Sequence, residues 1–148
     1  MGMFTSFDIN ASGLTAQRYR MDIISENVAN ANTTRTKDGT PYVRKVVSFA
    51  EKDKQTVFSR VLNGKMDKYT GTGVKVSGVY KDTETPMNMV YDPSHPDADE
   101  NGYVHYPNVN IITEMTNLID ASRSYEANAT AFTASKSIAL KGLNLGKN

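Results

Sequence analysis

Apolar residues recur at seven-residue spacing through the first part of the chain and fall on one stripe of a helix. Charged side chains lie mostly off this stripe, so we expect residues 5–34 to form one amphipathic helix with a narrow, coiled-coil-like seam. Gln17 interrupts the seam, and Gly13 weakens the helix near its start, where fraying or a kink is expected. The seam residues of this first segment are Leu14, Met21, Ile24, Val28 and Ala31.

A longer pattern of the same kind runs from Asn108 to Lys141, and as a helix it would measure about 50 Å. Asn108 or Asn110 can cap its start, where the charge of Glu114 suits the positive helix end, and Gly142 is a plausible stop. The expected seam consists of Ile111, Leu118, Tyr125, Phe132 and Ala139, with Met115, Ala129 and Leu143 in the neighbouring row and Ser122 and Lys136 as polar gaps.

The middle of the chain follows a strand-like pattern instead. The segments "YVRKVVSF" and "TGVKVSGVYKD" alternate or cluster β-branched residues, and a short strand is expected at residues 87–91. Asn63-Gly64, between the two segments, is a hairpin signal. The remainder is rich in Pro, Asp and Gly and is expected to be loop. A β-rich insert of this size has only a marginal core of its own.

These patterns predict an α+β fold. The long N- and C-terminal helices pack as an antiparallel, coiled-coil-like pair, with a small β-rich insert at the far end. We divide the chain into a terminal helical assembly domain, residues 1–34 with 108–148, and a β-rich insert with loops, residues 35–107. Two helices bury too little apolar surface to be stable alone. Their remaining faces are therefore expected to be covered by neighbouring subunits in a polymer.

Composition narrows the classes of function. The 148 residues carry a formal net charge of +1, which argues against a protein that binds nucleic acid by neutralising phosphates. No apolar run approaches the roughly 18 residues of a membrane span, so we expect no direct membrane insertion. The N-terminus lacks the basic and apolar regions of a cleaved secretory signal. Cysteine is absent, which removes disulfides, thiolate metal sites and cysteine nucleophiles.

One acidic stretch, Asp97–Gly102, fits the first half of an EF-hand calcium loop. Asn108 stands where the loop requires a bidentate Glu, and "DPSHP" precedes the stretch where a helix should end. A polar turn closed by its own side chains is the simpler interpretation. His95 and His105 match no known metal-binding spacing. No nucleophile motif, phosphate loop or dinucleotide-binding motif is present, so we expect no catalytic residue, no metal and no cofactor.

The stretch "SGLTAQRYRMDIISENVANANTTRT" resembles the N-terminal signature of the bacterial flagellar axial proteins of the rod and hook. The loop "VYDPSHPDADENGYV" and the later "PNVNIITEM" and "ASRSYEAN" are similar to segments of the flagellar basal-body rod proteins, in the same order. Residues 48–69 match no recognised motif, and an insertion is one interpretation of them. The pattern S-x-N-x-A-N-x-x-T of the family is met by Ser25, Asn27, Ala29, Asn30 and Thr33.

The resemblance implies a non-enzymatic subunit of the proximal rod, exported across the inner membrane by the flagellar type III apparatus and located in the basal body within the cell envelope. Its terminal helices would polymerise into part of the drive shaft that transmits motor torque and encloses the export channel, and motility would require it. The implied partners are other proximal and distal rod proteins, the export apparatus and the surrounding membrane-ring proteins.

In this setting, Asn27, Asn30 and Asn32 would bond neighbouring subunits or close the first helix, because Asn is disfavoured in helix interiors. The residues alone leave a second class of function open. That alternative is a soluble coiled-coil adaptor, or binding module, whose Asp97–Gly102 loop is modulated by calcium.

Overall fold

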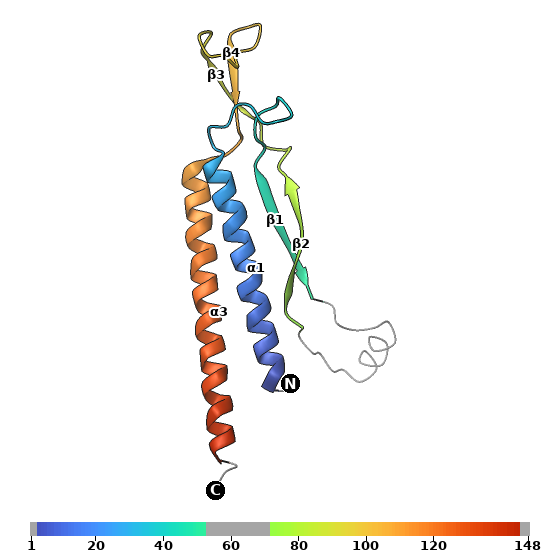
Figure 1. The fold of residues 1–148 in the computed structure, drawn as a ribbon, viewed down its shortest axis with the longest axis vertical. Coiled ribbons are helices and arrows are strands. Elements are labelled where there is room, and N and C mark those ends of the chain that lie inside the picture. The colour runs from blue at the N-terminus through green and yellow to red at the C-terminus, as the bar shows by residue number, and fades with distance from the viewer. Residues whose placement is uncertain (1–2, 53–71, 146–148) are drawn as a thin grey trace, which may run out of the picture.

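A computed structural model describes residues 3–52 and 72–145, and its main feature is a pair of long helices (Figure 1). Helix α1 spans Met3–Ala29 and helix α3 spans Ile111–Leu145. They run in opposite directions, so the start of α1 and the end of α3 lie at the same end of an elongated molecule. The predicted α+β fold with an antiparallel helix pair is confirmed.

The segment between the helices forms two separate antiparallel hairpin sheets. Strand β1, Lys45–Glu51, pairs with β2, Val74–Lys81, with a register shift between Ser48 and Phe49. Strand β3, Asn88–Tyr91, pairs with β4, Tyr103–Tyr106. The sequence pattern predicted three of these strands and missed β4, which follows the Pro- and Asp-rich loop directly and is only four residues long.

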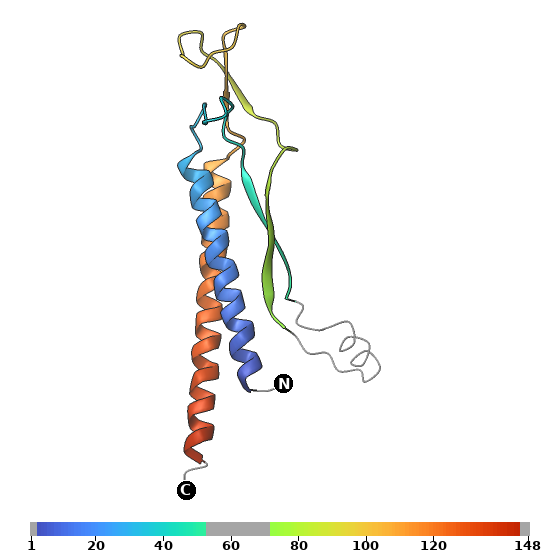
Figure 2. The ribbon, with the colours of Figure 1, turned by 45° about the vertical axis from the view of Figure 1, so that its right-hand side comes forward.

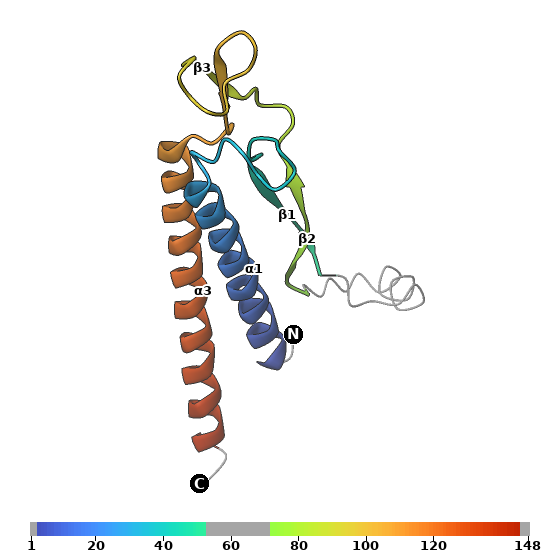
Figure 3. The ribbon, with the colours of Figure 1, turned by 45° about the horizontal axis from the view of Figure 1, so that its top comes forward.

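We expected the whole insert to lie at the far end of the helix pair, but only part of it does. Only the β3–β4 hairpin extends beyond the helices, whereas the β1–β2 hairpin folds back beside α1 (Figure 2). Figure 3 shows the same arrangement from above. Side chains of α1 hold the folded-back hairpin by its backbone. The Val74 amide donates to Ser12 Oγ, Asn27 Nδ2 donates to the Lys45 carbonyl, and Asn27 Oδ1 accepts from the Lys45 amide.

The helices meet through a seam that repeats every seven residues. The rings of Phe7 and Phe132 pack edge to face with centroids 5.1 Å apart, and the hydroxyls of Ser6 and Ser135 are 3.0 Å apart. Buried or half-buried side chains of α3 alternate at three- and four-residue steps. They are Glu114, Leu118, Ala121, Tyr125, Asn128, Phe132, Ser135 and Ala139.

The first row predicted for α3 is buried or half-buried at Leu118, Tyr125, Phe132 and Ala139 but exposed at Ile111. The row that includes Leu118, Tyr125 and Phe132 lies against α1, but its companion is offset by three residues, not by four. Met115 and Leu143 are consequently exposed, because the small and polar residues Ala121, Asn128 and Ser135 occupy the places expected for the predicted row. A pattern search that counts only large apolar residues misses such a row.

Helix α1 passes through Gly13 without interruption, contrary to the expected kink. The missing side chain has a packing role, because a Cβ at this position would stand 2.7 Å from Asn128 Oδ1. Helix α1 ends at Ala29, before the predicted Thr34, while α3 continues through Gly142 to Leu145. The hairpin signal Asn63-Gly64 and most of residues 48–69 lie outside the described residues.

The elongated shape leaves much surface open. Among the described residues, Ile112, Ile138 and Leu143 are 78%, 70% and 64% exposed. In the part of the chain that the structure describes, no helix is both long and apolar enough to cross a membrane. Exposed aliphatic side chains of this kind point to coverage by other protein subunits.

Candidate functional site

The polar junction, which we define as Asn27, Tyr42, Arg44, Asn108 and Glu114 with their bonded neighbours, joins α1, β1 and α3 at the head of the helix pair. Its centre is Asn27, whose side chain is 1% exposed. The Asn27 amide nitrogen donates to the Lys45 carbonyl at 2.8 Å and to Glu114 Oε2 at 2.9 Å. Its oxygen accepts from the Tyr42 hydroxyl and the Lys45 amide, both at 2.9 Å. All four hydrogen-bonding positions of this amide are therefore used inside one chain.

A buried carboxylate occupies the other side of the junction. Glu114 belongs to the first turn of α3 and is 1% exposed. Its Oε1 accepts from Arg44 Nε at 2.9 Å and Nη2 at 2.7 Å, and Arg44 Nη1 lies 3.3 Å from Asp82 Oδ2. Although burial lowers the pKa of Arg44, the bonds and charges of Glu114 and Asp82 outweigh it and raise the pKa above its usual value. The buried charge of Glu114 is thus paired, as a charge in a protein interior must be.

Tyr42 lies against this pair of charged groups. Burial first, and the negative charges of Glu26 and Glu114 next, raise the pKa of the Tyr42 phenol to about 12. Its ring packs with Ala31 and Val109 in a small buried cluster. Lys45 forms an ion pair with Glu26 on the outer side of the same junction. The phenol therefore stays protonated and donates to Asn27 across the physiological pH range.

The sequence offered Asn108 or Asn110 as the cap of α3, and the structure gives the two residues different roles. Asn110 caps α3, because its Oδ1 accepts from the amides of Ile112 and Thr113 at 3.0 and 3.2 Å. Asn108 is buried instead and accepts the Arg44 amide at 2.9 Å. Its Nδ2 donates to the carbonyls of Asp82 and Thr85. Asn108 therefore fixes the start of α3 to both ends of the β1–β2 hairpin.

The three asparagines at the end of α1 have different roles. Asn27 bonds within the chain, so the hypothesis that its amide binds a neighbouring subunit or closes the helix is wrong. Asn30 does close the helix, since its Nδ2 donates to the Glu26 carbonyl at 2.9 Å and its Oδ1 accepts from Thr33. Asn32 is exposed. Sequence reasoning missed Arg44 and Tyr42 as junction residues, because no spacing rule links positions 27, 44 and 114.

The predicted interaction residues fall into two groups. Most belong to the intramolecular seam: Ile24 is buried, and Leu14, Met21, Val28, Leu118, Tyr125, Ala129 and Phe132 are half-buried. Ile111 and Met115 are exposed and do not pack against α1. Among the family-motif residues not yet placed, Ser25 and Ala29 are exposed and Thr33 is half-buried.

A second apolar row, the outer stripe of α3, faces away from α1. It consists of Ile112, Met115 and Ile119, which are 78%, 55% and 53% exposed. These residues are spaced three and four apart and so lie on one side of the helix. The neighbouring side, with Thr113, Thr116 and Asp120, is exposed and polar. An apolar row of this kind beside a polar one is typical of a surface that another protein covers.

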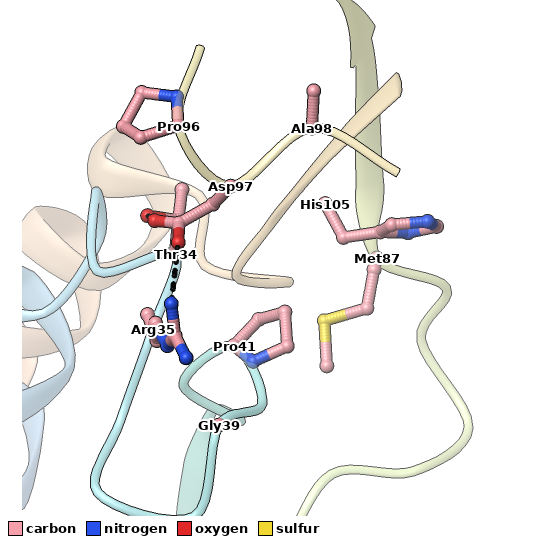
Figure 4. Close-up of a pocket in the computed structure, with 9 residues that line it drawn as sticks. All are labelled: Thr34, Arg35, Gly39, Pro41, Met87, Pro96, Asp97, Ala98 and His105. Atoms are coloured by element: carbon pink, nitrogen blue, oxygen red, sulfur yellow. Dashed lines mark hydrogen bonds and ion pairs between the residues drawn. The ribbon is translucent and has the colours of Figure 1, made fainter. Parts of the chain in front are cut away.

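The acidic loop does not have calcium-site geometry. Asp99 Oδ1 accepts from the amides of Asn101 and Tyr103, which lowers the Asp99 pKa, the Tyr103 bond contributing most. The Asp97 carboxylate accepts a hydrogen bond from the Thr34 hydroxyl at 2.8 Å. It also forms an ion pair with Arg35, whose Nη1 lies 3.6 Å from Oδ1 (Figure 4). Within residues 3–52 and 72–145, no group of three or more His, Cys, Asp or Glu side chains is placed to hold a metal ion. The loop is a turn closed by its own side chains.

The fold and the site together define a helical assembly subunit: a paired-helix rod, fixed at one end by a polar junction, with an apolar stripe open to a partner. Comparisons with known proteins agree. The chain matches the family models described as "Flagella basal body rod protein" over residues 7–37 and "Flagellar basal body rod FlgEFG protein C-terminal" over residues 100–145.

Relatives named flagellar basal-body rod protein FlgC match nearly the whole chain. The one from Bacillus subtilis is 46% identical, covering 99% of this chain and 100% of the relative. Those from Borreliella burgdorferi and Escherichia coli O6:H1 are 44% and 41% identical, covering 93% and 99% of this chain and 93% and 100% of the relatives. This chain belongs to the FlgC family of flagellar basal-body rod proteins. It is a non-enzymatic structural component of the rod.

Proposed function

We propose that this subunit polymerises with other proximal and distal rod proteins through its terminal helices, and that the resulting shaft transmits motor torque and encloses the export channel. The assembly domain comprises residues 1–34 with 108–148, and residues 35–107 form the insert. The chain reaches the rod through the flagellar type III export apparatus and lies inside the membrane-ring proteins. Motility requires it.

The outer stripe of α3 carries this proposal. Ile112, Met115 and Ile119 gain stability only when another surface removes them from water. Burying a largely exposed aliphatic side chain stabilises an assembly by about 1–2 kcal/mol. Every subunit of a polymer would gain this stabilisation at its own stripe. Ile138, Leu140 and Leu143, near the end of the same helix, are also exposed and add to the apolar surface. A subunit inside a rod has neighbours on several sides and would use all of this surface.

The predicted seam residues support the same assembly in two ways. Leu118, Tyr125 and Phe132 hold α3 on α1, and a fixed helix pair presents the outer stripe in one register. Ile111 and Met115 would contact the neighbouring subunit directly. Torque transmission needs both the fixed helix pair and the outer contacts, because helices that slide past each other would lose the register of those contacts.

The test replaces Met115 with Asp and compares it with Thr116→Asp on the adjacent polar side. Met115 is exposed, and an acidic residue is favourable in the first turns of a helix, so the purified monomer should unfold at an unchanged temperature. Met115→Asp should abolish incorporation into basal bodies and motility, whereas Thr116→Asp should retain both. Normal rods containing Met115→Asp would overturn the proposal.

A further inference from the structure

The two ends of the molecule carry exposed apolar side chains that the helix pair leaves uncovered. At the far end, the register of β3 and β4 places Met89 opposite His105 and Tyr91 opposite Tyr103. Met89 and Tyr91 are both 65% exposed, and the Tyr91 and Tyr103 rings meet edge to face at 5.3 Å. Met and Tyr are enriched in protein interfaces because they combine large contact area with few polar requirements.

At the opposite end, α3 extends past α1. Because Ser6 lies beside Ser135, Met3 at the start of α1 falls level with residue 138. Residues 138–145, the overhang, therefore lie at or beyond the start of α1, and Ala139 is the last of the described side chains to be buried (Figure 1). In the overhang, Ile138, Leu140 and Leu143 are 70%, 52% and 64% exposed. Leu140 and Leu143, three residues apart, lie on one side of the helix, and Ile138 lies on another. A helix end that is apolar on several sides is normally buried.

The charges of the two ends are opposite. The acidic tip, residues 82–106, contains no Lys or Arg and carries Asp82, Glu84, Asp92, Asp97, Asp99 and Glu100. Arg35 pairs with Asp97 and Arg44 pairs with Asp82, so two of these charges are offset, while Glu84, Asp92, Asp99 and Glu100 have no Lys or Arg partner among the described residues. Residues 127–148 contain no Asp or Glu and carry Lys136, Lys141 and Lys147. One chain therefore displays both halves of a complementary pair, at ends too far apart to meet within the molecule (Figure 1).

The acidic tip also has a hollow that can receive side chains. A pocket of about 420 Å³ lies between the loop after α1 and the acidic tip (Figure 4). Pro41, Met87, Pro96 and Ala98 supply its apolar lining. Asp97 also lines it and is paired there with Arg35, so the negative charge open to a partner comes from the rest of the acidic tip. The volume accommodates more than one aliphatic side chain. The acidic tip is thus suited to an apolar segment that also carries positive charge.

We propose that the acidic tip of one subunit receives the α3 overhang of a second copy of this chain. Leu140 and Leu143 would meet the exposed face of the β3–β4 hairpin and the pocket beside it, and Lys141 would face Glu100. The contact joins two different surfaces and so builds an open helical array, not a closed dimer. The inference rests on the proposed function, since it specifies one contact within the polymer.

The test uses disulfide formation in assembled basal bodies. The native chain has no cysteine, so every disulfide would come from introduced residues. Full-length chain carrying both Met89→Cys and Leu143→Cys replaces the native copy, basal bodies are isolated and oxidised, and products are separated without reductant. Dimers and longer oligomers of this chain are expected. The control, Met89→Cys with Asp22→Cys on the exposed side of α1, should give none.

Charge reversal provides a second readout in the same background. Lys141→Glu should lower the cross-linking yield about fivefold, the effect of losing one favourable surface pair. Adding Glu100→Lys should restore the yield, because the pair is then inverted and not lost. A yield that is unchanged by Lys141→Glu, or a double reversal that falls further, would overturn the proposed pairing.

The outcomes separate this contact from the function on which it rests. The chain could enter basal bodies and either never cross-link to itself or cross-link only to a different protein. Either result would refute the second copy as the occupant of the acidic tip and would leave the proposed rod function intact. Native chain absent from basal bodies would refute the proposed function. If the first cysteine pair is not incorporated, Glu100→Cys with Leu140→Cys tests the same contact under the same criteria.

Discussion

Replacing Asn27 with Asp changes one atom of the polar junction and reverses its hydrogen bonding. An oxygen would take the place of Nδ2, which now donates to the Lys45 carbonyl and to Glu114 Oε2 at 2.8 and 2.9 Å. Both contacts would become repulsive, and two carboxylates would face each other in a site where Asn27 and Glu114 are each 1% exposed. The shape of the side chain is unchanged, so packing does not complicate the result.

The expected cost follows from the groups left unpaired. Leaving a buried donor or acceptor unsatisfied costs about 1–3 kcal/mol, and an uncompensated buried charge costs about 3–5 kcal/mol. We expect Asn27→Asp to lower the free energy of unfolding by about 3–5 kcal/mol near neutral pH. The loss should be smaller at acidic pH, because protonation of either carboxyl removes the repulsion and restores a donor.

Urea unfolding followed by the helical circular dichroism signal measures this directly. Asn32→Asp is the matched control, because Asn32 is exposed and lies in the same segment. We expect the control to change stability by less than about 0.5 kcal/mol. A loss below about 1 kcal/mol for Asn27→Asp, or equal losses for the two variants, would refute the assignment of Asn27 to the junction.

Three further predictions follow from the same contacts. Arg44→Lys should destabilise the fold by about 2 kcal/mol in thermal unfolding, because an ammonium cannot reach both Glu114 and Asp82. Hydrogen bonds from backbone amides and hydroxyls lower the pKa of Asp82, Asp92 and Asp99 in the folded state. The stability that these carboxylates contribute is therefore complete above their unfolded pKa and is lost as pH falls below about 4, which acid unfolding curves would show. The pKa of Tyr42 is raised to about 12, so the folded state should lose stability as pH rises above about 10, and Tyr42→Phe should remove the latest step of a phenolate absorbance titration.

The elements that sequence patterns located best are the ones fixed by local periodicity. Helix α1 follows from the seven-residue repeat of Leu14, Met21 and Val28, and α3 from that of Leu118, Tyr125 and Phe132. The companion row was misplaced because Ala121 and Asn128 carry no large apolar signal, and packing against Gly13 was needed to reveal it.

The junction lay outside the reach of sequence reasoning for a different reason. Its contacts join residues separated by 15 to 87 positions, and such pairs leave no spacing in a single sequence. A clue was present, because Asn in a helix interior and Glu114 in the first turn of α3 are both unusual in a buried seam. Arg44, inside an apparent strand, could be assigned to them only once the fold had brought the three together.

A map of the intact basal body at side-chain resolution tests the central claim most directly. The account predicts that Ile112, Met115 and Ile119 are buried against a helix of a neighbouring rod subunit, with α1 and α3 paired as in the isolated chain. A map in which this stripe faces solvent while subunits touch only through residues 35–107 would contradict it.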